Sequence, residues 1–255
     1  SEPVFVPVYE VDFPDPFVIQ HQGQFLAFST NARGLNVPVA LSGNLVDWQP
    51  ARDAAGKPVD AMPGLAAWVK GGRTWAPEVM KVGNRWLLYY TAHHAARNKQ
   101  CIGVASAADP RGPYTDRSPG PLLCQYDLGG TIDANPFRDK DGQLYVTYKN
   151  DGNAIGQKTR IWSQRLSPDG MSVVGPAVAL AENDAKWEAH VVEASTLVHT
   201  PDGIAPRDGS ALREPASGDL LVRAPTSADP LGLLDANGLR LEWLASYEPA
   251  PGTVA

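Results

Sequence analysis

A pattern of β-strand signals repeats three times along the chain and limits the available folds more than any other feature. Each copy begins with an apolar, strand-forming run, turns at a glycine, returns through an aromatic-rich strand and adds a third strand. The copies start near residues 17, 77 and 135, a period of about 60 residues. All-β units that repeat at such a period are typical of a β-propeller, in which each unit is one blade. We therefore predict an all-β fold of the propeller type.

The expected strands follow this pattern. They cover residues 17–20, 25–30 and 37–42 in the first copy, 76–82, 85–91 and 101–106 in the second, and 135–138, 143–148 and 160–166 in the third. A fourth copy starts at residues 193–200, with its turn at 201–203. No stretch shows convincing helical periodicity. His93 and His94 follow an expected strand and have no motif support, so we expect them in a loop.

Composition places the chain among globular proteins and excludes some partners. Hydrophobic residues make up 43% of its 255 residues and charged residues 20%. The net charge of −6 argues against a nucleic-acid footprint and against attraction to an anionic membrane surface. No apolar run approaches the ~18 residues that a membrane-spanning helix needs. We therefore expect no nucleic-acid partner and no membrane partner.

The two cysteines and the start of the chain leave the cellular compartment open. Cys101 and Cys124 have no metal-ligand spacing and form at most one disulfide bond. The sequence starts at Ser1 without a charged and then apolar leader, so we expect that any signal peptide was removed or never existed. Secretion and a cytoplasmic location both fit these observations.

Three acidic residues precede the first strands of three copies. Asp15 lies before the first copy, and Pro16 after it favours an extended backbone at Asp15. Asp133 precedes the third copy and Glu193 the fourth. Because the first strand of each propeller blade lines the central channel, these carboxylates would converge on the propeller axis. The alternative is that they are three unrelated turn residues.

Glycoside hydrolysis needs converging carboxylates of this kind. A general acid protonates the leaving oxygen, and a general base activates a water molecule. In inverting enzymes the two carboxyl groups lie about 6.5–9.5 Å apart, which leaves room for that water. We expect this separation between Asp15 and Glu193.

Several ordered motifs accompany the three acids. They are Phe13-Pro14-Asp15-Pro16, Thr74-Trp75-Ala76-Pro77-Glu78-Val79, Gly103-Val104-Ala105-Ser106, Pro110-Arg111-Gly112-Pro113-Tyr114, Ile132-Asp133 and Val192-Glu193-Ala194. With these motifs, the chain from about residue 5 to residue 200 resembles glycoside hydrolase family 43. That resemblance implies a five-bladed β-propeller that hydrolyses arabinofuranosyl or xylosyl linkages in hemicellulose or arabinan with inversion of configuration.

The resemblance also implies roles for individual residues. Asp15 matches the general base and Glu193 the general acid, while Asp133 matches the residue that adjusts the protonation of the acid and orients it. Trp75 matches an aromatic residue against which the sugar packs; a core tryptophan at a strand start is the alternative. No cofactor is required and no metal ligand is implied. A structural calcium ion is left open.

The resemblance ends near residue 200. Between Trp187 and Trp243 the sequence contains no Phe, Tyr or Trp, although the family's fourth blade should return through an aromatic-rich strand. We therefore divide the domain into residues 1–200, which hold the blades and the carboxylates, and an atypical C-terminal segment, residues 201–255. A shifted reading frame and true divergence both account for such a segment.

Two functions of different classes follow. The first is an inverting glycosidase of the arabinofuranosidase or β-xylosidase type, of low activity if the propeller is incomplete, acting on oligosaccharides of plant polysaccharides. The second is an incomplete, weakly active or inactive propeller that binds carbohydrate or self-assembles. About four blades and an atypical tail would leave open sheet edges, which invite pairing with another chain. We therefore expect a homo-oligomer that covers the open edge.

Overall fold

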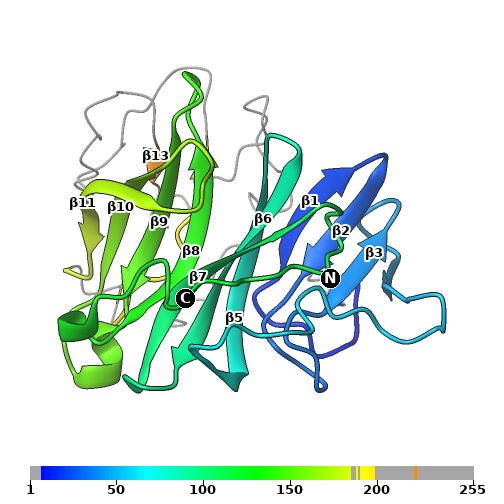
Figure 1. Cartoon of the computed structure of the whole chain (residues 1–255), viewed down its shortest axis with the longest axis horizontal. Coiled ribbons are helices and arrows are strands. Elements are labelled where there is room, and N and C mark those ends of the chain that lie inside the picture. The colour runs from blue at the N-terminus through cyan, green and yellow to red at the C-terminus, as the bar shows by residue number, and fades with distance from the viewer. Residues whose placement is uncertain (1–6, 185–187, 189, 199–220, 223–255) are drawn as a thin grey trace, which may run out of the picture. The chain divides into compact units, whose positions relative to one another are not determined.

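The computed structural model describes residues 7–184, 188, 190–198 and 221–222, which are organised mainly as β-sheets (Figure 1). The chain divides into two compact units, Ser1–Cys124 and Gln125–Ala255. The described ranges include two short 3₁₀ turns, η1 (Tyr126–Leu128) and η2 (Gly152–Ile155). The prediction of an all-β fold is confirmed. No helix in these ranges is long and apolar enough to span a membrane.

The first unit contains two antiparallel sheets in which neighbours in sequence are neighbours in space. One sheet consists of β1 (Phe17–His21), β2 (Gln24–Phe28), β3 (Val39–Ser42) and β4 (Trp48–Pro50). The other consists of β5 (Val69–Val82), β6 (Arg85–His94) and β7 (Lys99–Ala107). Each sheet is the meander expected of a propeller blade.

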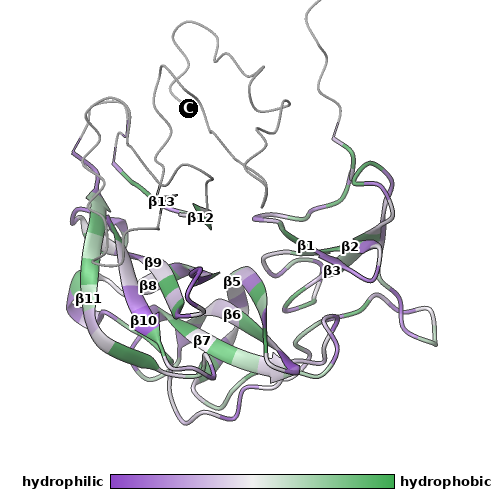
Figure 2. Cartoon of the chain, turned by 90° about the horizontal axis from the view of Figure 1, so that it is seen from above, coloured by the Kyte–Doolittle hydropathy of each residue, from purple (hydrophilic) through white to green (hydrophobic). Residues whose placement is uncertain are grey.

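The second unit contains one four-stranded antiparallel sheet and a short pair of strands. The sheet runs in the order β8 (Thr131–Arg138), β9 (Leu144–Asn150), β10 (Arg160–Leu166) and β11 (Val173–Glu182). The pair is β12 (Leu197–Val198) with β13 (Leu221–Val222). Hydrophobic and hydrophilic residues mix along the strands of the larger sheet, as green and purple bands in Figure 2 show.

The central strands explain why the aromatic-rich runs predicted strands so well. β6 is buried at every position except its two ends, and β9 is buried throughout. Near-continuous burial requires apolar and aromatic residues on both faces of a strand. Packing between neighbouring strands is close, because a Cβ atom on Gly103 would lie 2.5 Å from the Tyr90 ring. The glycine of the Gly103-Val104-Ala105-Ser106 motif therefore makes room for a buried tyrosine.

Most expected strands are confirmed, with several differences. β5 begins at Val69 rather than near residue 76, β8 begins at Thr131 rather than at residue 135, and β4 and β11 were not predicted. The expectation of a loop at His93 and His94 is wrong, because both residues belong to β6 and pair with residues of β7. The His93 side chain is buried and lies 3.2 Å from Gln100 Oε1.

Predictions about the C-terminal segment fall largely outside the described residues. The expected turn at residues 201–203 and most of residues 201–255 are among those not described. The division into residues 1–200 and 201–255, the incomplete propeller and the homo-oligomer therefore stay predictions. In the fourth copy, the described strand is β12, which starts later than the expected residue 193.

A disulfide bond closes the first unit near its end. Cys101 of β7 and Cys124 form this bond over a sequence separation of 23 residues, which agrees with the expectation of at most one disulfide. The neighbouring residues Ile102 and Leu123 form a β-bridge alongside it. The segment after β7 is thus fastened to the sheet both covalently and by backbone hydrogen bonds.

Removing this disulfide should destabilise the protein. We expect a Cys101→Ala/Cys124→Ala double variant to lose about 3 kcal/mol of unfolding free energy, because a closed loop of this length restricts the unfolded chain. The corresponding fall in melting temperature is roughly 6–12 °C. Thermal unfolding followed by circular dichroism measures it, and reduced wild-type protein should melt with the variant. Identical melting of the oxidised wild type and the variant would contradict this expectation.

Candidate active site

Asp15 is held in an unusual backbone conformation just ahead of β1. Its φ of 50° lies in the left-handed region, so the expectation of an extended backbone is wrong. The Asp15 Oδ2 atom accepts a 2.6 Å hydrogen bond from Thr30 Oγ1. The Thr30 N–H in turn donates to the Pro14 carbonyl oxygen over 3.0 Å. These two hydrogen bonds offset the strain of the left-handed backbone. They thereby outweigh the preference for an extended conformation that Pro16 gives to Asp15.

Thr30 also connects Asp15 to the second sheet of the same unit. The Ala76 N–H of β5 donates to Thr30 Oγ1 over 2.8 Å. Next to it, the Asn31 N–H donates to the Thr74 carbonyl oxygen over 2.8 Å. One hydroxyl group therefore links the Asp15 carboxylate to the backbone of β5.

Trp75 lies beside this link. It is partly buried and is paired with Thr91, and the register of β5 against β6 shifts between Trp75 and Glu78. Ala76, directly after it, has a left-handed φ of 39°. Trp75 thus lies at an irregularity in the middle of β5, with part of the residue accessible to solvent. A role in packing against a sugar ring stays a prediction.

Asp133 and Glu193 are brought together in the second unit. Asp133 lies in β8 at a register shift between Ile132 and Asn135, with a left-handed φ of 58°. Its Oδ2 atom accepts a 3.2 Å hydrogen bond from the N–H of Ala194, the residue after Glu193. Ala194 is itself left-handed, with φ 54°. The Asp133 carboxylate therefore fixes the backbone that carries Glu193.

The segment around Glu193 is further fastened to the sheet of the second unit. The hydrogen bonds are Val192 N–H to Thr159 Oγ1 at 2.8 Å, Ser195 Oγ to Thr147 Oγ1 at 3.1 Å, and Leu197 N–H to Asn135 Oδ1 at 3.0 Å. The Leu197 side chain packs in a core with Phe137, Tyr145, Ile161 and Leu180. Glu193 thus extends from a backbone that is anchored on both sides.

The Glu193 side chain itself is 51% exposed and contacts a lysine that is not exposed at all. Lys149 Nζ lies 3.4 Å from Glu193 Oε2, 3.6 Å from Asp151 Oδ1 and 2.7 Å from Asn153 Oδ1. Sequence reasoning missed both Lys149 and Thr30. A lysine inside a run of apolar and aromatic strand residues was the available signal for Lys149.

The four copies share one backbone feature. Asp15, Ala76, Asp133 and Ala194 are all non-glycine residues with positive φ; Asp15 and Ala194 lie just before β1 and β12, and Ala76 and Asp133 lie within β5 and β8. When the copies are aligned on these left-handed residues, Glu193 precedes Ala194 just as Trp75 precedes Ala76. Glu193 therefore aligns with Trp75, whereas Asp15 and Asp133 are themselves the left-handed residues. Asp15 lies in the first unit and the other two acids in the second, so the separation of 6.5–9.5 Å between Asp15 and Glu193 stays a prediction.

Some titratable groups with shifted pKa values lie away from these acids. Burial raises the pKa of Tyr90 and of Tyr148, so both remain neutral phenols near neutral pH. Hydrogen bonds from Lys158 and then Arg160 hold the pKa of Glu182 below its usual range. A carboxylate with two cationic partners stays ionised, so Glu182 is unsuited to the role of a general acid.

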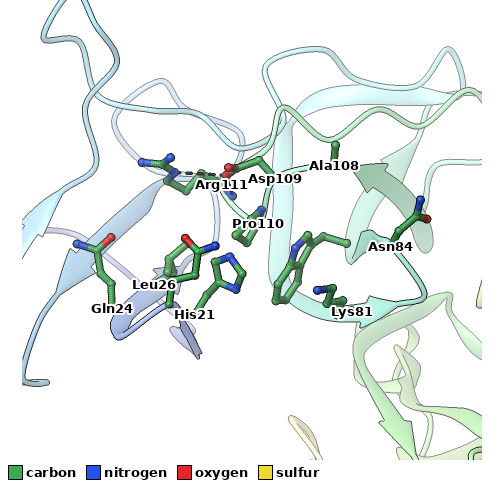
Figure 3. A pocket seen from close by; sticks show the side chains of 11 residues that line it. His21, Gln24, Leu26, Lys81, Asn84, Ala108, Asp109, Pro110 and Arg111 are labelled. Carbon is green, nitrogen blue, oxygen red and sulfur yellow. Dashed lines mark hydrogen bonds and ion pairs between the residues drawn. The ribbon is translucent and has the colours of Figure 1, made fainter.

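A cavity of about 340 Å³ in the first unit lies at the opposite end of β1 from Asp15 (Figure 3). Its lining includes His21, Lys81, Asp109 and Arg111. Burial acts to raise the pKa of Asp109, but hydrogen bonds from the backbone and side chain of Arg111 outweigh it and leave that pKa below its usual range. None of the four predicted site residues lines this cavity.

Metal binding was left open by the sequence. Within the described ranges, no group of three or more His, Cys, Asp or Glu side chains is arranged to hold a metal ion. The structural calcium ion that the sequence leaves open is not tested by this observation.

Comparison with known families covers most of the chain. Residues 5–204 match the model of the family described as glycosyl hydrolases family 43. The chain belongs to this family. The matched residues include Asp15, Trp75, Asp133 and Glu193.

Curated relatives of this family 43 chain are named as arabinan-cleaving enzymes. It is 24% identical over 171 residues to the extracellular endo-α-(1→5)-L-arabinanase 2 of Bacillus subtilis, covering 58% of this chain and 34% of that protein. It is 28% identical over 187 residues to the probable arabinan endo-1,5-α-L-arabinosidase A of Aspergillus flavus, covering 72% and 53%. The chain thus spans between a third and about half of the length of these relatives.

Solved structures of family 43 share the fold. A thermostable family-43 glycoside hydrolase is 25% identical, with a TM-score of 0.61 over 75% of this chain and 60% of the other. The endo-arabinase of Bacteroides thetaiotaomicron is 20% identical, with a TM-score of 0.63 over 79% and 71%. The prediction of a fold of the five-bladed propeller type is confirmed.

Removing the Thr30 hydroxyl should measurably weaken the first unit. We expect Thr30→Val to lower the free energy of unfolding by about 1–2 kcal/mol, because Asp15 loses a donor and Ala76 an acceptor. Thr30→Ser keeps the hydroxyl and should stay within about 0.5 kcal/mol of wild type. Urea unfolding of both variants measures the difference. Equal stability of the valine variant and wild type would mean that water replaces the hydroxyl without loss.

Proposed function

We propose that this family 43 chain is an inverting glycoside hydrolase that cleaves arabinofuranosyl linkages of arabinan. The observation that carries the proposal is the family match over residues 5–204, which includes all three predicted acids. The names of the curated relatives favour arabinofuranosyl over xylosyl linkages. Xylosyl linkages remain the alternative substrate, and attack at chain ends or within chains is an outcome of the tests below.

The proposed reaction is a single displacement. A water oxygen attacks the anomeric carbon and gives one proton to the Asp15 carboxylate, while the glycosidic C–O bond breaks. The departing oxygen takes a proton from the Glu193 carboxyl group, so the sugar leaves as a neutral alcohol. Attack from the face opposite the leaving group inverts the anomeric configuration.

The local structures suit these roles. The Asp15 and Glu193 side chains are accessible to solvent, as groups that exchange protons with water and substrate must be. The Thr30 hydroxyl donates to the Asp15 carboxylate and so holds it in one orientation. The Ala76 N–H donates to the same hydroxyl, and Trp75 is the residue directly before Ala76. This short connection to Asp15 supports the proposed contact between Trp75 and the sugar.

The proposal is tested by hydrolysis of defined substrates. We expect faster release of sugar from linear α-1,5-arabinan and arabino-oligosaccharides than from xylan and xylo-oligosaccharides. Glu193→Ala and Asp15→Asn should each lose about 100-fold or more in kcat, in the range of general acid–base catalysis. Glu182→Gln is the matched control, because it changes a carboxylate of the same unit that pairs with Lys158 and Arg160. We expect that control to stay within about twofold of wild type.

Product analysis separates the possible mechanisms and functions. Proton NMR during early turnover should show the inverted anomer first; the retained anomer would contradict the proposed mechanism. Product lengths distinguish internal cleavage from cleavage at chain ends. Binding of arabino-oligosaccharides without turnover would instead favour the carbohydrate-binding alternative.

Asp133 should control the pH range of activity. It approaches the backbone beside Glu193 and carries a negative charge, which favours the protonated form of a neighbouring acid. We expect Asp133→Asn to move the high-pH limb of the kcat profile to lower pH. Rates across pH 4–9 with arabino-oligosaccharides measure this shift, and an unmoved limb would remove Asp133 from its proposed role.

A further inference from the structure

A buried lysine contacts the proposed general acid. The Lys149 side chain is 0% exposed, and its Nζ lies 3.4 Å from Glu193 Oε2. Two further oxygen atoms surround the ammonium group, Asn153 Oδ1 at 2.7 Å and Asp151 Oδ1 at 3.6 Å. The ammonium group therefore donates hydrogen bonds to Asn153 and Glu193 and forms an ion pair with Asp151.

Stability of the fold does not account for this lysine. Burying a charge costs free energy, and apolar residues of similar volume often replace buried ion pairs without loss. Asp151 and Asn153 already give Lys149 a counter-charge and an acceptor within a few residues of the chain. The third contact reaches a side chain 44 positions away that is half exposed and does not need a partner for its own burial.

The chemistry of lysine determines which group donates and which accepts in the hydrogen bond between Lys149 and Glu193. An ammonium group donates hydrogen bonds and has no lone pair with which to accept one. Oε2 of Glu193 is therefore the acceptor, and the proton of a neutral Glu193 lies on Oε1. We propose that Lys149 is a positioning residue that makes Oε1 the proton-donating oxygen of Glu193. This inference rests on the proposed function of Glu193 as general acid.

Lys149 also favours the charge that forms during the reaction. When Oε1 gives its proton to the departing oxygen, Glu193 becomes a carboxylate whose Oε2 faces the ammonium group. A hydrogen bond from an ammonium group to a carboxylate is stronger than one to a neutral carboxyl group, so the contact strengthens along the reaction. Two other acidic side chains lie near this contact. Asp151 forms an ion pair with Lys149 Nζ and partly compensates its positive charge. Asp133 accepts a hydrogen bond from the Ala194 N–H, next to Glu193.

Leaving groups of different basicity test the proposal. An oligosaccharide leaving group needs a proton from the acid, whereas 2,4-dinitrophenolate departs without one. For Lys149→Met we expect kcat on arabino-oligosaccharides to fall about 10–100-fold, with KM within about threefold. On 2,4-dinitrophenyl α-L-arabinofuranoside we expect a fall of less than about threefold. Lys149→Arg, which keeps the charge and the donors, should recover part of the loss.

Control variants make the outcomes separable. Lys158→Met is the matched control, because Lys158 belongs to the same unit and pairs with Glu182 instead of Glu193. It should change neither rate. If Lys149→Met does not fold, Asn153→Ala removes the shortest contact of Lys149 and should show the same difference between substrates in smaller measure.

Three results would count against the proposal in distinguishable ways. Equal losses on both substrates in folded Lys149→Met would overturn the positioning role while leaving Glu193 as the acid. A Glu193→Ala variant whose loss does not depend on the leaving group would overturn Glu193 as general acid, and with it the proposed function. A wild-type chain that turns over neither substrate would overturn both.

Discussion

The left-handed backbone within or just before the first strand of each copy is the constraint on which the candidate site depends. Residues other than glycine pay about 1–2 kcal/mol for this conformation and keep it only where surrounding contacts hold it. In the first unit, the Thr30 hydroxyl joins the Asp15 carboxylate to the Ala76 N–H. In the second unit, the Asp133 carboxylate accepts directly from the Ala194 N–H. The acidic side chains thus maintain the backbone geometry that presents the proposed catalytic groups.

The second unit contains two lysine–carboxylate contacts that differ in burial. Lys158 pairs with Glu182 at 2.6 Å, but its side chain is 58% exposed, where water weakens the attraction. Lys149 lies at 3.4 Å from Glu193 but is fully buried, where its charge acts through a less polarisable medium. Distance alone would rank these contacts in the wrong order. Burial, and not distance, therefore favours an electrostatic effect of Lys149 on Glu193.

Sequence patterns predicted the strands and the acids but not the contacts that hold them. The central strands are buried on both faces, so their apolar and aromatic runs were clear signals. β11 was missed because Gly175 and Pro176 interrupt it, which an edge strand tolerates. Asp133 and Glu193 were singled out because each precedes a predicted strand, although β8 already begins at Thr131 and therefore contains Asp133. Lys149 was not singled out. Its place in an apolar run signals a buried lysine, but a contact with a residue 44 positions away leaves no pattern that names the partner.

The Cys101–Cys124 disulfide means that one amino-acid sequence can exist in an oxidised and a reduced form. Disulfides form and persist in oxidising surroundings and are rare where cellular thiols stay reduced. A preparation from a reducing cytoplasm and one exported through an oxidising compartment would share every residue yet differ in one bond. The thermal tolerance of a sample would then report where the chain was made as well as what it is made of.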